Sequence, residues 1–152
     1  MMKFAIAQEI DLEASKKVHI IEKVSNLIKS FLSNKDYGDG LQHFYIGLIC
    51  IRPRPGYEDW FKIRRPRYYK ETTVESIDGS KNVLYGVYGY DIKPDYERFV
   101  YSSNEESERI LAEEILKSLS HFDRLSKRVK NFDAKRFKRD LEQFLITTYY
   151  LG

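Results

Sequence analysis

The stretch LQHFYIGLICI, residues 41–51, is the longest near-continuous apolar run in the chain. Both sets of alternating positions within it are mostly apolar, so neither face of a strand formed here would be solvated. Such a strand belongs inside a sheet that is covered on both sides or that packs against a partner. A buried helix is the competing interpretation, but β-branched and aromatic residues, with Gly40 before and Pro53 after, favour a strand. We therefore expect residues 41–51 to form the central strand.

Weaker strand and helix patterns flank this run on both sides. The predicted strands are residues 2–10, 41–51, 60–64, 72–77 and 82–92, and the predicted helices are 12–32, 103–119 and one that follows Asp133. Apolar residues at helical spacing indicate the first helix, in which Asp11 can cap the first turn. A doubled capping box, Ser102 and Ser103 followed three positions later by Glu105 and Glu106, indicates the second.

The connections between these elements predict the fold class. Asp78-Gly79 is a hairpin turn signal, and hairpins join antiparallel strands. We therefore expect an α+β fold, a mostly antiparallel sheet of four to five strands with one N-terminal and two C-terminal helices packed on it. At 152 residues, the chain is expected to form a single domain, residues 1–152.

Composition limits the classes of protein to consider. The net charge of +3 is too small to imply nucleic-acid or membrane binding by itself. Cys50 is the only cysteine, which excludes an intrachain disulfide and fits a reducing compartment. The first residues turn acidic too early for a signal peptide, and no stretch approaches the ~20 apolar residues of a membrane span. We expect a cytoplasmic protein that does not enter the membrane.

Motifs for catalysis are missing from the sequence. None of the three histidines has another metal-ligating residue at a typical spacing, and there is no nucleophile elbow, P-loop or dinucleotide-binding glycine motif. Cys50 could in principle be a nucleophile, but a small buried apolar residue is the better interpretation. We therefore predict no catalytic residues, no metal and no cofactor, and expect that the protein is not an enzyme. A carboxylate site assembled only in three dimensions stays open.

Charge and aromatic residues are concentrated in residues 52–70 instead. This segment contains seven basic and only two acidic residues, and five aromatic residues lie among them. Arginines beside aromatic rings can anchor a protein partner or bind nucleic acid through phosphates and stacked bases. A solvated strand edge kept soluble by charge is the third interpretation. The predicted partner-binding residues are Trp60, Arg64, Arg65, Arg67, Tyr68 and Tyr69.

An acidic segment, residues 91–114, is the counterpart of this basic one. Eight carboxylates fall within it. Acidic and basic surfaces on one protein favour self-association, as in a homodimer, or a charged partner.

Three segments carry a resemblance to a known family. WFKIRRPRYYK (residues 60–70) with the strand pair after it, DYERFV (95–100) and SNEESERILAEEILKSL (103–119) resemble bacterial immunity proteins of polymorphic toxin systems. The resemblance covers roughly the middle of the chain. It implies a small, non-enzymatic α+β protein that binds and neutralises a cognate toxin, and it assigns no catalytic residue. A nucleic-acid-binding module that uses residues 52–70 is the alternative.

The slightly basic charge bears on this expectation, because a protein that blocks a nuclease directly is often acidic. Either the acidic residues 91–114 contact the toxin, or the toxin is not a nuclease, or the inhibition is allosteric.

Overall fold

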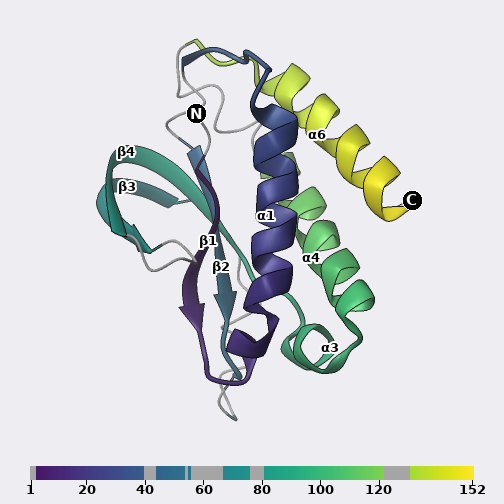
Figure 1. The fold of residues 1–152 in the computed structure, drawn as a ribbon. Coiled ribbons are helices and arrows are strands. Elements are labelled where there is room, and N and C mark those ends of the chain that lie inside the picture. Colours follow the sequence, from purple (N-terminus) through teal and green to yellow (C-terminus); the bar gives the residue numbers. More distant parts are fainter. Residues whose placement is uncertain (1–2, 40–43, 54, 56–66, 76–80, 122–130) are drawn as a thin grey trace.

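Four strands form one sheet in the computed structural model, which describes residues 3–39, 44–53, 55, 67–75, 81–121 and 131–152. The strands are β1 (Lys3–Ile10), β2 (Phe44–Cys50), β3 (Arg67–Glu75) and β4 (Lys81–Ile92). Their order in the sheet is β1-β2-β4-β3, so the predicted central strand does lie inside the sheet (Figure 1). The sheet is curved, and its edge strands β1 and β3 contact each other.

The prediction of a mostly antiparallel sheet is wrong. β2 pairs in parallel with β1 on one side and with β4 on the other, and only β3 and β4 pair antiparallel. The connection from β1 to β2 carries a helix, which returns the chain so that both strands run the same way. The hairpin signal at residues 78–79 correctly predicted that β3 and β4 pair antiparallel. β4, and not β3, is the strand that lies next to β2, and that pairing is parallel.

The helices lie on one side of this sheet (Figure 1). They are η1 (Ala14–Lys17), α1 (Val18–Leu32), α3 (Tyr96–Tyr101), α4 (Asn104–Ser118), η3 (Leu119–His121) and α6 (Ala134–Tyr149). α1 packs on β1, α4 contacts β4, and α6 packs on α4. The side chains of Asp95, Ser103 and Asp133 each accept a hydrogen bond from the backbone N–H three residues later. The caps predicted at Ser103 and Asp133 are therefore confirmed.

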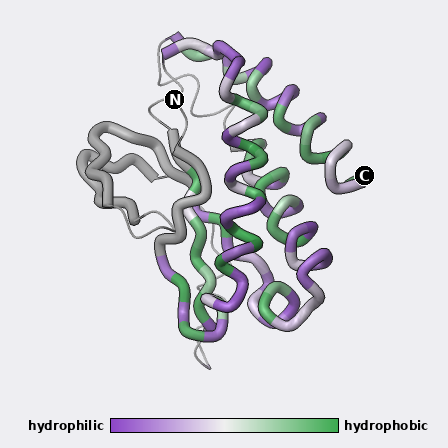
Figure 2. The backbone as a smooth tube through the Cα atoms, in the orientation of Figure 1, coloured by the Kyte–Doolittle hydropathy of each residue, from purple (hydrophilic) through white to green (hydrophobic). Residues whose placement is uncertain are grey.

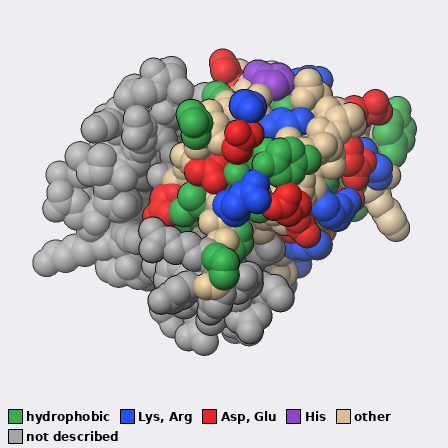
Figure 3. Space-filling view, turned by 90° about the horizontal axis from the view of Figure 1, so that it is seen from below, with side chains coloured by type: hydrophobic (Ala, Val, Ile, Leu, Met, Phe, Trp, Pro, Cys, Tyr) green, Lys and Arg blue, Asp and Glu red, His purple; other side chains and the backbone are tan. Residues whose placement is uncertain are grey.

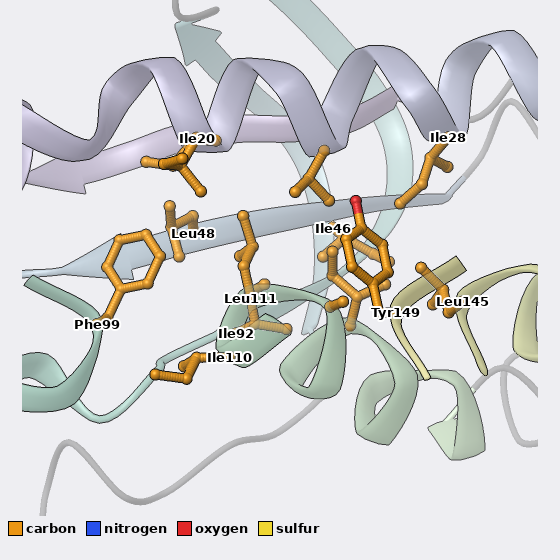
Figure 4. Packing of buried hydrophobic residues seen from close by; sticks show 14 of the residues in the cluster. Ile20, Ile28, Ile46, Leu48, Ile92, Phe99, Ile110, Leu111, Leu145 and Tyr149 are labelled. Carbon is orange, nitrogen blue, oxygen red and sulfur yellow. The ribbon is translucent and has the colours of Figure 1, made fainter. Parts of the chain in front are cut away.

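The main core lies between β2 and the helices. Ile46 and Leu48 of β2 point into it, opposite Ile20 of α1 and Leu111 of α4 (Figure 4). Phe99 of α3 is fully buried at one end of this core. Along α1, α4 and α6, hydrophobic residues alternate with hydrophilic ones, as expected of helices with one buried face (Figure 2).

A second set of contacts joins the loop after α1 to the start of α6. The Tyr37 hydroxyl donates to Asp140 Oδ2 at 2.9 Å, and the Tyr37 ring meets the Phe137 ring edge-on. The guanidinium carbon of Arg136 lies 4.8 Å from the centre of the Tyr37 ring. Gly38 has φ +94°, and a Cβ there would lie 2.2 Å from the carbonyl oxygen of Asn131. Glycine is required at this position because any side chain would collide with the neighbouring backbone.

Candidate functional site

The predicted partner-binding residues divide into two groups. Trp60, Arg64 and Arg65 lie outside the described residues. Arg67, Tyr68 and Tyr69 begin the edge strand β3, where their Cα partners on β4 are Gly89, Tyr88 and Val87. The structure therefore brings the last three together at one edge of the sheet.

The part of this basic segment that the structure describes in atomic detail begins at Arg52. β1, β2 and β4 run parallel, so their carboxyl ends lie at the same edge of the sheet. Asp11 follows β1, Arg52 comes shortly after β2, and α3 begins four residues after β4. In α/β proteins this edge is where ligands commonly bind.

Asp11 holds these three strand ends together. Its carboxylate accepts hydrogen bonds from the backbone N–H of Ala14 at 2.9 Å and of Arg52 at 3.0 Å. The Tyr96 hydroxyl lies 2.8 Å from both carboxylate oxygens, and the backbone N–H of Asp11 donates to the carbonyl of Cys50 at 3.2 Å. Desolvation alone would raise the pKa of Asp11, but these hydrogen bonds and the Arg52 charge lower it below its ordinary value. Asp11 therefore does not cap the helix as expected, since the N-cap residues are Glu13 for η1 and Lys17 for α1; it binds the first backbone N–H of η1 and links β1, β2 and α3.

Arg52 lies at the surface of this edge with a fixed orientation. One guanidinium nitrogen, Nη1, pairs with Glu97 Oε1 at 3.1 Å, and the other, Nη2, donates to the Tyr101 hydroxyl at 2.5 Å. The guanidinium carbon lies 5.1 Å from the centre of the Tyr96 ring and 5.8 Å from that of Tyr101. Both are within the range of a cation–π interaction. Four contacts from α3 thus orient one exposed arginine side chain.

α3 is in turn anchored to the start of α1. Lys17 is buried, and its Nζ donates to the carbonyl of Ser102 at 2.8 Å and to Asn104 Oδ1 at 3.0 Å. These two acceptors lie where α3 ends and α4 begins. Lys17 thus donates to the carbonyl of Ser102 at the end of α3, where the helix itself supplies no backbone N–H donor. Arg52 therefore rests on a helix that is held at both ends, by Tyr96 and by this lysine.

The arrangement is suited to holding chain segments and not to proton transfer. Burial, together with the Asp11 carboxylate, raises the pKa of Tyr96 to about 12, so its hydroxyl stays protonated at neutral pH. Burial, with a smaller effect of Asp11, also raises the pKa of Cys50 to about 12, so little of the reactive thiolate forms. The Asp11 oxygens already accept several hydrogen bonds.

Metal-binding clusters and membrane-spanning helices are both absent from the described residues. Within those ranges, no three His, Cys, Asp or Glu side chains gather closely enough to hold a metal ion. Among the helices of the same ranges, none combines the length and the apolar character needed to cross a bilayer.

The acidic segment is largely paired within the protein. Glu97 meets Arg52, Glu106 meets Arg98 and Arg109, and Glu108 meets Lys23 at 3.0 Å. Glu114 lies 3.7 Å from Lys117. The acidic and basic segments therefore meet each other through Arg52 and Glu97. Sequence reasoning missed this contact because 45 residues separate the two side chains.

Sequence reasoning also missed two exposed apolar side chains at this end of the molecule: Tyr101, whose hydroxyl contacts Arg52, and Leu12, which follows Asp11 in the chain. Leu12 is 83% exposed, although it was expected to begin an amphipathic helix, and Tyr101 is 56% exposed. The helix pattern gave no signal for Leu12, because the chain turns at residues 12–13 before η1.

Comparison with known proteins gives one family. No curated protein matches the chain. No solved structure matches it either. The family model described as Immunity protein 44 matches residues 2–147, which is nearly the whole chain and more than the segments that carried the resemblance. The family of bacterial immunity proteins expected from the sequence is thereby confirmed: the chain belongs to the Immunity protein 44 family.

Proposed function

We propose that this protein neutralises a cognate bacterial toxin by binding it, without catalysing a reaction. The observation that carries the proposal is the family match over residues 2–147. An immunity protein must meet a toxin, and a stable protein complex is the simplest way to block one. We place this encounter in the bacterial cytoplasm, as the composition suggests.

The state of the described polar groups supports a non-catalytic mode. Tyr96 and Cys50 both have pKa values raised to about 12, so neither is a base or nucleophile at neutral pH. The Asp11 carboxylate is engaged with backbone and tyrosine donors. Side chains used in this way stabilise a surface for binding.

The anchors of the complex remain those that the sequence predicts. We propose that Trp60, Arg64, Arg65, Arg67, Tyr68 and Tyr69 contact the toxin, since Trp, Tyr and Arg dominate binding energy in protein interfaces. Arg67, Tyr68 and Tyr69 follow one another on the same strand, β3, which supports their acting together.

Co-expression with the toxin domain encoded beside this gene tests the proposal. Cells that carry both proteins should survive, and the two should co-purify. In a titration with purified proteins, toxin activity should fall linearly and vanish at an equimolar ratio. Toxin released from the complex should regain its activity with an unchanged mass. Failure to rescue or to co-purify refutes the proposal, and inactivation at a small fraction of the toxin concentration would indicate an enzyme.

Substitution of the predicted anchors tests their role. Trp60→Ala and Arg65→Ala should each weaken toxin binding at least about fivefold, equivalent to ~1 kcal/mol, if they are interface hot spots. Salt distinguishes the alternative function: binding to single-stranded nucleic acid would fall steeply between low and high salt, because phosphate contacts release counterions. Tight nucleic-acid binding by wild type without toxin binding would favour that alternative.

A further inference from the structure

At the carboxyl edge of the parallel strands, the described surface combines exposed apolar side chains with an ion pair. We infer that Leu12, Arg52, Glu97 and Tyr101, here called the Arg52 surface, form part of the interface with the toxin. The partner face that would fit is a protein surface with an apolar recess and a carboxylate. This inference rests on the proposed function and adds a location and a partner chemistry to it.

Arg52 connects the members of this surface. Its backbone N–H donates to Asp11, the neighbour of Leu12, and its guanidinium contacts both Glu97 and the Tyr101 hydroxyl. Arg52, Glu97 and Tyr101 thus contact one another, and Leu12 follows Asp11 in the chain, at the end of the molecule that carries η1 and α3. Figure 3 views this end from below and shows hydrophobic side chains among acidic and basic ones.

The exposure of its apolar members points to a binding role. Leu12 is 83% exposed and Tyr101 is 56% exposed. A single exposed apolar side chain is common, but an exposed tyrosine in contact with an arginine combines two residue types that are enriched in interfaces, and Leu12 adds exposed apolar area. Packing Leu12 and the Tyr101 ring into a recess of a partner would remove their apolar area from water.

Arg52 is held in place before any partner arrives. Glu97, the Tyr101 hydroxyl and the rings of Tyr96 and Tyr101 fix its guanidinium. A side chain ordered in advance loses less conformational entropy on binding. A guanidinium also has five N–H donors, so it can bind a partner carboxylate in addition to its own contacts. A partner carboxylate is thus the charged group that complements this surface.

The charge of this end favours a protein over a polyanion. Three exposed basic side chains at this end are paired with carboxylates, Lys16 with Glu13, Arg52 with Glu97 and Arg98 with Glu106. A nucleic acid would have to compete with all three pairs and would gain little from the leucine. The surface is also continuous along the chain with the predicted anchors, because Arg52 is the first basic residue of segment 52–70.

Two matched pairs of variants test the location. Tyr101→Ser and Leu12→Ser should each weaken binding to an inactivated form of the neighbouring toxin domain at least tenfold, measured by calorimetry on the full chain. Tyr150→Ser and Leu27→Ser are the controls, since Tyr150 is 88% exposed and Leu27 is 37% exposed, and neither belongs to the Arg52 surface. The controls should change affinity less than twofold.

A third pair tests the charged member. Arg52→Ala should weaken toxin binding at least tenfold, whereas Arg136→Ala should leave it within twofold. Arg136 is a close match, because it also pairs with a carboxylate, Asp133, and lies over a tyrosine ring, that of Tyr37. Urea unfolding of each variant shows whether it is folded under the binding conditions.

Each outcome decides between the two proposals. If wild type binds the toxin and the Arg52-surface variants bind equally well, the inference is wrong and the proposed function stands. If wild type does not bind the toxin, both fail. Equal losses of toxin affinity in the Arg52-surface variants and in the control variants would overturn the inference. If wild type is a dimer by light scattering and Tyr101→Ser a monomer with unchanged toxin affinity, the occupant is a second copy and the inference is also overturned.

Discussion

Two clusters with the same three residue types lie toward opposite ends of α1. Near η1, the Tyr96 hydroxyl binds Asp11 while the Arg52 guanidinium lies over the Tyr96 ring. Beyond the other end of α1, the Tyr37 hydroxyl binds Asp140 while Arg136 lies over the Tyr37 ring. We call these the Asp11 cluster and the Asp140 cluster. Both tyrosine rings are buried, with 6% and 3% of their surface exposed.

The clusters differ in what their carboxylates hold. Asp11 accepts from two backbone N–H groups and one tyrosine, and so joins β1, β2 and α3. Asp140 accepts from Tyr37 and from Arg139, the residue before it. The same chemistry therefore fixes the ends of a sheet in one place and attaches a loop to a helix in the other. The number of donors on the carboxylate determines how much structure depends on it.

The largest expected effect is the difference in stability between variants of Asp11 and of Asp140. Asp11→Ala should lower the free energy of unfolding by about 3 kcal/mol, because it leaves two backbone N–H groups and a buried hydroxyl without their acceptor. Asp140→Ala should cost about 1 kcal/mol, since one tyrosine hydroxyl loses its partner. Urea unfolding followed by circular dichroism measures both. Equal losses of unfolding free energy in the two variants would show that the extra donors at Asp11 do not add to stability.

Gly38 tests how rigidly the loop of the Asp140 cluster is held. Gly38→Ala should lower the free energy of unfolding by about 2 kcal/mol, because alanine disfavours positive φ and its Cβ would strike the Asn131 carbonyl. Gly152→Ala is the control, since a Cβ there meets nothing within 4 Å. Thermal unfolding of both variants gives the comparison. An unchanged melting temperature for Gly38→Ala would mean that the loop can move away from α6.

Acid should weaken the Asp11 cluster specifically. Because the pKa of Asp11 is lowered in the folded protein, its contribution to stability is present above about pH 4 and is lost as pH falls through the folded pKa. The urea midpoint of wild type should therefore fall more steeply below about pH 4 than that of Asp11→Asn, which cannot ionise. Parallel curves for the two proteins would show that Asp11 is not the group responsible.

The smallest expected effect on stability concerns the two arginines. Arg52→Ala and Arg136→Ala should each shift the urea midpoint less than Asp11→Ala does, because both guanidinium groups are substantially exposed and their ion pairs are screened by water. Any difference between the arginines should appear in toxin binding. A large loss of stability for Arg52→Ala alone would assign it a structural role.

Much of the local structure could be predicted from the sequence. The apolar run of residues 41–51 predicted the inner strand β2, and Ser103 and Asp133 predicted the starts of α4 and α6. A strand that is apolar on both faces is also typical of parallel sheets, and hairpin signals alone led to the antiparallel prediction. Of the candidate site, the sequence indicated the basic segment from Arg52 onward, but it did not connect Arg52 with Asp11, Glu97 or Tyr101.

By itself the sequence determined that residues near 2–10, 44–50 and 82–92 form strands and that α1, α4 and α6 form, because apolar spacing and capping side chains act over a few residues. It placed β3 only in part, and the strand predicted at 60–64 lies outside the described residues. Only the tertiary structure decided the strand order and the Asp11 cluster, whose members lie 41 and 85 residues from Asp11. Such contacts depend on which surfaces pack together and leave no local pattern. The physical reason is that hydrogen bonding and burial reward proximity in space, whatever the separation along the chain.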